Sequence, residues 1–141
     1  MHIEALVMGE GMAQDADGIF SLIRIGQNLF GPPSLPAQTK RSFLTLLVED
    51  ENEDLNGETL ELSFQFLNPA GVVILAQNLS LQVGEKRLKN LRAASWIPCE
   101  LLLSVSVLGT HKFEVVLRRG LDELDRKSTN LHVLEASELA G

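Results

Sequence analysis

The sequence predicts an all-β fold, an antiparallel β-sandwich of about seven to eight strands joined by Greek-key connections. Short runs of strand-favouring residues are separated by turn residues along the whole chain. No long segment has helical periodicity, so we do not expect the crossover helices that join parallel strands. The alternation of strands and breaks is clearest near the end, from Leu101 to Glu135.

The first half of the chain is predicted to hold four strands. Ile3 to Met8 is short and apolar, and it runs into a turn-rich connection. Gly18 to Gly26 is rich in isoleucine and phenylalanine, which favour a pleated surface. Thr39 to Asp50 continues the pattern as far as an acidic run. Glu58 to Leu67 alternates most strictly, with apolar residues on one face and polar residues on the other.

The second half is predicted to contain two hairpins and a last strand. A tight turn at 68–71 leads into Val72 to Ala76, which Leu79 to Val83 extends past a bulge. Leu101 to Val107 and Lys112 to Arg118 are expected to form the second hairpin, at the centre of the core. Asp122 to Asn130 is polar and is expected to be a connection; the last strand is then 131–134.

One domain is expected to span residues 1–135, followed by a flexible C-terminal tail at 136–141. The apolar positions of the strands define its expected core. These are Ile3, Ala5, Val7, Ile19, Ile23, Phe43, Leu62, Phe64, Phe66, Val73, Leu102, Val105, Val107, Phe113, Val115 and Leu117.

Two segments interrupt the strand pattern. Asn28 to Pro36 contains three prolines, which fix φ and remove backbone donors. We expect this segment to be an ordered extended loop that crosses from one sheet to the other. Gly84 to Ala94 is the least β-like stretch, with room for one short helical turn, and it forms a basic loop in an acidic protein.

The composition restricts the partners that the chain is expected to bind. The 141 residues include 12 basic and 19 acidic ones, for a formal net charge of −7. Such a charge repels phosphate backbones and anionic membranes, so neither nucleic acid nor a membrane is expected as a partner. The single cysteine excludes an intrachain disulfide, and the N-terminal residues do not read as a secretory signal. These features predict a cytoplasmic protein.

The acidic run at 49–54 shares part of its pattern with a calcium-binding loop. Asp50, Asn52 and Asp54 supply oxygens at positions one, three and five, and Glu61 falls at position twelve. Position six is Leu55, however, where the EF-hand turn requires glycine. The run is therefore interpreted as a solvated hairpin tip, with a cation site as the alternative.

The residues able to carry covalent or metal chemistry are few. Cys99 follows a proline at the start of an apolar strand, which favours a buried packing role over a catalytic thiolate. The spacing of His2, His111 and His132 matches no zinc motif, and Cys99 has no partner cysteine. No nucleophile, base and orienting group come together in the sequence, so we expect no enzymatic activity and no cofactor.

Several segments share their layout with a known family. They are HIEALVMG followed by GIFSLIRIG, the proline-bearing FGPPSLPA, the strand pair around NPAG, and LLLSVSVLGTHKFEVVLRRG. With this layout, most of Met1 to Glu135 resembles small uncharacterised bacterial β-sandwich proteins of the immunoglobulin-like type. Phe113 stands where such domains often carry a tyrosine. The resemblance implies a fold and lends no activity, so no functional residue is transferred.

The function expected from the sequence is that of a non-enzymatic protein-interaction or structural module, which binds another protein or itself as a homo-oligomer. The alternative is a small-molecule or calcium-binding β-sandwich domain. The partner surface is expected at the hairpin edges and in the irregular segments, where the candidate residues are Phe30, Pro32, Pro33, Leu35, Lys86, Arg87, Lys89 and Arg92.

Overall fold

The computed structural model describes residues 1–26, 28–84, 92 and 94–140. Ten strands and one short helix lie among these residues. They are β1 (His2–Gly9), β2 (Gly11–Gln14), β3 (Phe20–Ile23), β4 (Leu29–Phe30), β5 (Ala37–Val48), β6 (Thr59–Leu67), β7 (Val73–Gln82), β8 (Ala94–Val105), β9 (Gly109–Arg119), β10 (Asp122–Val133) and α1 (Ala136–Ala140).

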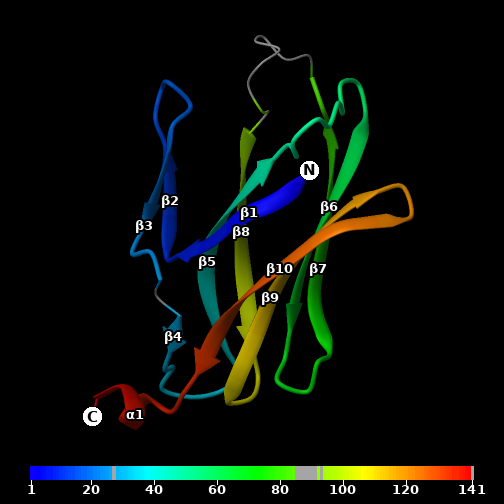
Figure 1. Ribbon diagram of the computed structural model, residues 1–141. Coiled ribbons are helices and arrows are strands. Elements are labelled where there is room, and N and C mark those ends of the chain that lie inside the picture. The colour runs from blue at the N-terminus through cyan, green and yellow to red at the C-terminus, as the bar shows by residue number, and fades with distance from the viewer. Residues whose placement is uncertain (27, 85–91, 93, 141) are drawn as a thin grey trace.

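The strands form three sheets that are mostly antiparallel, which confirms the predicted all-β class. The three-stranded sheet has the order β1-β5-β8, and the five-stranded sheet has the order β4-β10-β9-β6-β7. In the second sheet only the two-residue β4 runs parallel to its neighbour β10. The third sheet is the hairpin of β2 and β3, which stands apart from the long strands in Figure 1.

The two larger sheets share one hydrophobic core. The cluster includes buried side chains from β1, β5 and β8 and from β6, β9 and β10. At its centre the rings of Phe43 in β5 and Phe113 in β9 are stacked, with their centroids 3.6 Å apart. Phe64 of β6 extends the stack, 6.0 Å from Phe113. The alternation of apolar residues thus places one face of each sheet against the other.

Several predicted elements are confirmed. The strands predicted at Ile3 to Met8 and Glu58 to Leu67 agree with β1 and β6 to within one residue at each end. The predicted turn at 68–71 joins β6 to β7, and the Asn68 N–H donates to the Val72 carbonyl. The proline segment leads from β4 in the five-stranded sheet to β5 in the three-stranded sheet, as expected.

The predicted hairpin of Leu101 to Val107 with Lys112 to Arg118 is wrong. All twelve residues of β8 pair with β5, whereas β9 pairs with β6 and β10 in the other sheet. Residues 106–108 therefore carry the chain across the core from one sheet to the other. In the sequence, a crossing between sheets and a hairpin look the same, because each consists of two alternating apolar and polar segments separated by a short break.

The predicted polar connection at Asp122 to Asn130 is also wrong, because these residues form most of the twelve-residue β10. Most of this stretch is exposed, so it lacks the apolar alternation of a half-buried strand. Charge pairs made by Arg126 support it instead, one across strands and one within β10. Arg126 lies 2.6 Å from Glu114 of β9 and also bonds Glu123 on its own strand.

The expected core is correct in part. The predicted members Ile3, Phe43, Leu62, Phe64, Phe66, Val105, Phe113, Val115 and Leu117 are buried. Ala5 and Val7 are half-buried, whereas Ile19, Ile23, Val73, Leu102 and Val107 are exposed. In β8 the residues on either side of Leu102, Leu101 and Leu103, are buried instead. Because Leu101, Leu102 and Leu103 are all apolar, the sequence does not indicate which of them face the core. The prediction that Leu102 is a core residue is wrong for this reason.

His111 is a buried titratable group within this core. Its side chain is fully buried, its ring stacks on Phe66 at 5.4 Å, and its Nδ1–H donates to the Gly109 carbonyl. Nε2 has no hydrogen-bond partner among the described residues. Burial lowers the pKa of His111, although the bond to Gly109 opposes the shift. The imidazole is therefore held in its neutral form.

The buried His111 should make the fold less stable in mild acid. A lowered folded-state pKa gives stability that is complete above the unfolded value of about 6.5 and is lost as pH falls below it. The loss should reach up to about 1.4 kcal/mol per pH unit, measured by urea unfolding between pH 5 and 8.

The comparison should use a His2→Gln background. His2 bonds Glu4 and Asp50, which raise its pKa and give a contribution of opposite sign, lost as pH rises. His111→Phe should flatten the acid loss while it keeps an aromatic ring against Phe66. An equal pH slope with and without His111 would contradict this account.

Candidate functional site

The predicted partner residues of the proline segment lie mostly against the core. Phe30 and Leu35 are half-buried and pack against the hydrophobic cluster, and Pro32 is buried. The guanidinium of Arg41 lies 5.8 Å from the centre of the Phe30 ring. Of the four predicted residues in this segment, Pro33 is the exposed one.

Of the four basic residues in the predicted partner surface, the structure describes Arg92. Lys86, Arg87 and Lys89 lie outside the described residues. Arg92 is exposed, and its guanidinium lies 3.7 Å from the carboxylate of Glu51. In Figure 1, β4 and the start of β8 lie at opposite ends of the fold, so the two parts of the predicted surface do not form one continuous patch.

The acidic tip is occupied by cationic groups of the chain itself. The Met1 amino group bonds the carboxylates of Asp50 and Glu53, and His2 bonds Asp50. The bond to the amino group, with that to His2, lowers the pKa of Asp50. Within the described ranges, no three His, Cys, Asp or Glu side chains are grouped in a way that could hold a metal ion.

Cys99 lies in β8 with 8% of its side chain exposed. Its Sγ lies 3.9 Å from the side-chain oxygen of Gln77 in β7, so the two strands approach each other across the core. Burial raises the pKa of the thiol to about 11. At neutral pH the group is therefore a protonated packing residue.

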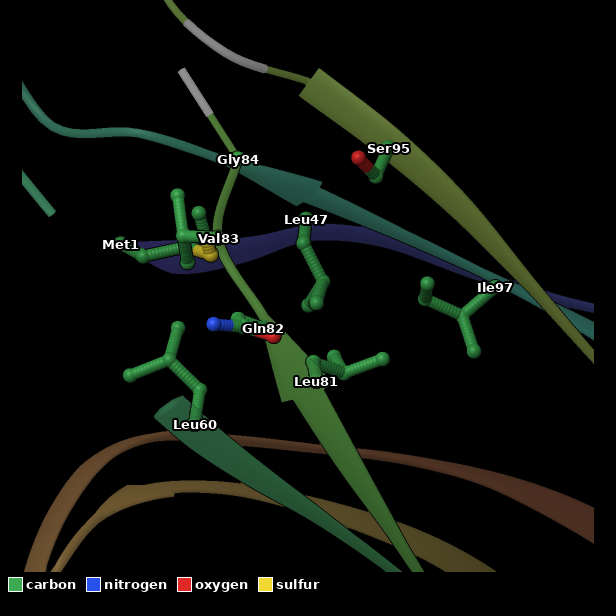
Figure 2. Close-up of a pocket in the computed structure, with 9 residues that line it drawn as sticks. All are labelled: Met1, Leu47, Leu60, Leu81, Gln82, Val83, Gly84, Ser95 and Ile97. Carbon is green, nitrogen blue, oxygen red and sulfur yellow. The ribbon is translucent and has the colours of Figure 1, made fainter. Parts of the chain in front are cut away.

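A cavity of about 260 Å³ opens between β7 and β8 at the end near the N-terminus. In Figure 2, Leu47 of β5 and Ile97 of β8 line one side, while Leu60 of β6 and Leu81 of β7 line the other. Gln82 and Ser95 add polar groups to an otherwise apolar wall. The remaining lining residues are Met1, Val83 and Gly84.

The two sides of the core are closed to different degrees. On one side β1 meets β10, and we call this contact the closed seam. There the Ile3 N–H donates to Asp125 over 2.7 Å, and Lys127 donates to the Ile3 carbonyl over 3.0 Å. On the other side the edges β7 and β8 border the cavity, and we call residues 73–83 and 94–98 the open seam.

Apolar side chains are exposed along the open seam. Val73, Ile74 and Leu79 of β7 are 44%, 43% and 39% exposed, and Trp96 of β8 is 46% exposed. Leu79 lies opposite Leu62, which is fully buried. Leu79 therefore shares the inward face of the sheet and is uncovered because the facing sheet ends at β8. The sequence predicts partner surfaces at hairpin edges in general, but its alternation does not reveal that β7 is the strand that lies at an edge.

Comparison with protein-family models, with curated proteins and with solved structures finds no match to this chain. In the part of the chain that the structure describes, no helix has the length and apolar character needed to cross a membrane.

The Cys99 thiol should be almost unreactive in the folded protein. A pKa raised from 9.0 to about 11 lowers the thiolate fraction at pH 8 roughly a hundredfold, and burial slows access further. Reaction with Ellman's reagent at pH 8 should be slow in buffer and fast in guanidinium chloride.

A matched control is Cys99→Ser combined with Ser104→Cys, which places a thiol at an exposed position of the same strand. This thiol should react rapidly in the folded protein. Equal rates for Cys99 in the native and denatured protein would contradict its buried, protonated assignment.

Proposed function

We propose that this chain is a non-enzymatic protein-interaction or structural module built on an immunoglobulin-like or Greek-key β-sandwich. The observation that carries the proposal is the open seam, where the edge strands β7 and β8 border a cavity and leave apolar side chains exposed. Exposed apolar side chains on an unpaired strand edge provide a surface for a partner. The partner is another protein or a second copy of the chain.

The proposed sandwich is supported by the shared core of the two larger sheets. Phe43 from one sheet stacks on Phe113 from the other, and inward residues of both sheets belong to one cluster. The resemblance to small bacterial immunoglobulin-like proteins agrees with such a two-layer arrangement. Greek-key connectivity agrees with the crossing at 106–108, which joins β8 of one sheet to β9 of the other.

A non-enzymatic role is supported by the state of the reactive side chains. Cys99 is buried and protonated, and His111 is buried and neutral. The carboxylate of Asp50 binds the Met1 amino group. A protein partner in the cytoplasm, rather than a nucleic acid or a membrane, is favoured by the net charge of −7.

Site-specific photo-crosslinking in the native cells tests this proposal. A benzoyl-phenylalanine placed at Leu79 or Trp96, both exposed at the open seam, should give covalent adducts with another protein or a second copy. The same group at Ser128, exposed on β10, should give few or none. Absence of adducts at both seam positions would reject an interaction surface there.

The cavity supports a second candidate, the binding of a small apolar molecule. Apolar walls from Leu47, Leu60, Leu81 and Ile97 with a few polar groups are typical of small ligand pockets. The size of about 260 Å³ is slightly below the usual range for drug-sized ligands, so a compact ligand fits best.

Calcium binding at the acidic tip stays a prediction, tested by the melting temperature with and without calcium.

The uncharged fluorescent probe N-phenyl-1-naphthylamine tests whether the cavity binds a small apolar molecule. The probe should gain fluorescence with the wild-type protein, and Ile97→Phe should reduce binding because the larger side chain occupies the cavity. Leu102→Phe adds the same volume at an exposed position of the same strand and should leave binding unchanged. Equal binding by both variants would rule out the cavity as the site.

A further inference from the structure

Three of the four edges of the two larger sheets are protected against pairing with another chain. The outer edge of β1 is covered at the closed seam by side chains of β10. β8 carries Pro98, which has no N–H, and Glu100. β4 has two residues and is followed by Pro32 and Pro33. Short strands, prolines and charges are the usual means of blocking an edge.

The fourth edge, β7, lacks these protections. It is ten residues long, with the sequence VILAQNLSLQ, and contains no proline. Among the described strands of eight or more residues, it is the one without an acidic or basic side chain. Its exposed Val73, Ile74 and Leu79 add apolar contact area. An edge of this kind is suited to pair with a further strand.

The backbone of β7 indicates which groups are available for pairing. The Val83 N–H, just after the strand, donates to the Glu58 carbonyl and so points toward β6. Because donors alternate along a strand, the N–H groups of Ala76, Asn78 and Ser80 point to the outer side. No described strand pairs with β7 on that side.

We propose that β7 pairs antiparallel with β7 of a second copy of this chain, with Asn78 on the two-fold axis. The two five-stranded sheets then form one continuous sheet of both copies. This inference rests on the proposed function, which assigns the open seam to protein binding, and it names the partner as a second copy.

The register follows from the direction of the backbone and from the leucines on the inward face. With Asn78 opposite Asn78 of the second copy, the outward N–H groups of both strands meet in hydrogen-bonded pairs. Leu75 then lies opposite Leu81 of the second copy, and Leu79 lies opposite its Gln77. These four positions share the inward face, because they pair with Phe66, Leu60, Leu62 and Phe64 of β6.

The lack of charged side chains makes β7 the edge at which two copies of the chain can approach with least repulsion. Two chains of net charge −7 repel each other over most of their surfaces. β7 has no acidic or basic side chain, so self-pairing brings no like charges into direct contact. A two-fold axis through Asn78 makes one surface serve both copies, as in most protein dimers.

A charge-swap experiment tests both the pairing and the register. Sedimentation velocity of the wild-type protein should show a concentration-dependent species of twice the chain mass. Asn78→Lys and Asn78→Asp should each weaken this dimer about a hundredfold or more, because two like charges then meet at the axis. An equimolar mixture of the two variants should restore it. Asn130→Lys, at an exposed asparagine of the interior strand β10, should leave the dimer unchanged.

Each outcome decides a separate point. A wild-type protein that stays monomeric at all accessible concentrations would overturn the self-pairing. A dimer that persists in both Asn78 variants, or that the mixture fails to restore, would overturn the position of the axis. In either case, photo-crosslinks from Leu79 or Trp96 to a different protein would still support the proposed function. Their absence would remove that function independently.

Discussion

The stacking of Phe43 on Phe113 is the contact on which the rest of the structure depends. The rings come from β5 and β9, the strands near the middle of the two larger sheets, and at most 1% of either side chain is exposed. An aromatic pair of this kind adds about 0.5–1.5 kcal/mol beyond the burial of its area. Its larger effect is geometric, because it sets which strands of the two sheets face each other. With β5 over β9, β1 lies beside β10, and β8 lies where it reaches Gln77 of β7 through Cys99.

The unequal width of the two sheets explains why the seams differ. Three strands cannot cover the inward face of five, so the edge strand β7 extends beyond the cover that β8 provides. Leu79 is exposed for this reason, although it points to the same side as the buried Leu62 across the ladder. The cavity lies at the same place, between strands that approach without pairing. The same mismatch thus accounts for both the exposed leucine and the cavity.

The sequence predicted the strands whose alternation is set by one buried face. β6 is the clearest example, since Leu62 and Phe64 are buried while Glu61 is exposed. Local sequence pattern is a poor guide where a strand has no buried apolar face. β10 is stabilised by charge pairs such as Arg126 with Glu114, which resemble a polar loop in the sequence. The connection at 106–108 was misjudged because no local signal says whether a chain returns to the same sheet.

The candidate site was less predictable for the same reason. A proline segment looked exposed in the sequence, whereas Phe30 and Leu35 pack against the core. The uncharged run of β7 is visible in the sequence, but it becomes meaningful only when pairing places that strand at an edge. Sequence pattern therefore identified what the strands are made of, and the position of each strand in its sheet determined what its surface can bind.

The closed seam has a consequence for the way the chain is made. Ile3 is held by Asp125 and Lys127, residues more than 120 positions later in the sequence. On the ribosome, β1 is therefore made more than 120 residues before the side chains that cover it. During that interval β1 can already pair with β5, yet its outer edge remains open to other nascent chains. The period of greatest exposure to misassembly therefore falls during synthesis, before β10 has emerged.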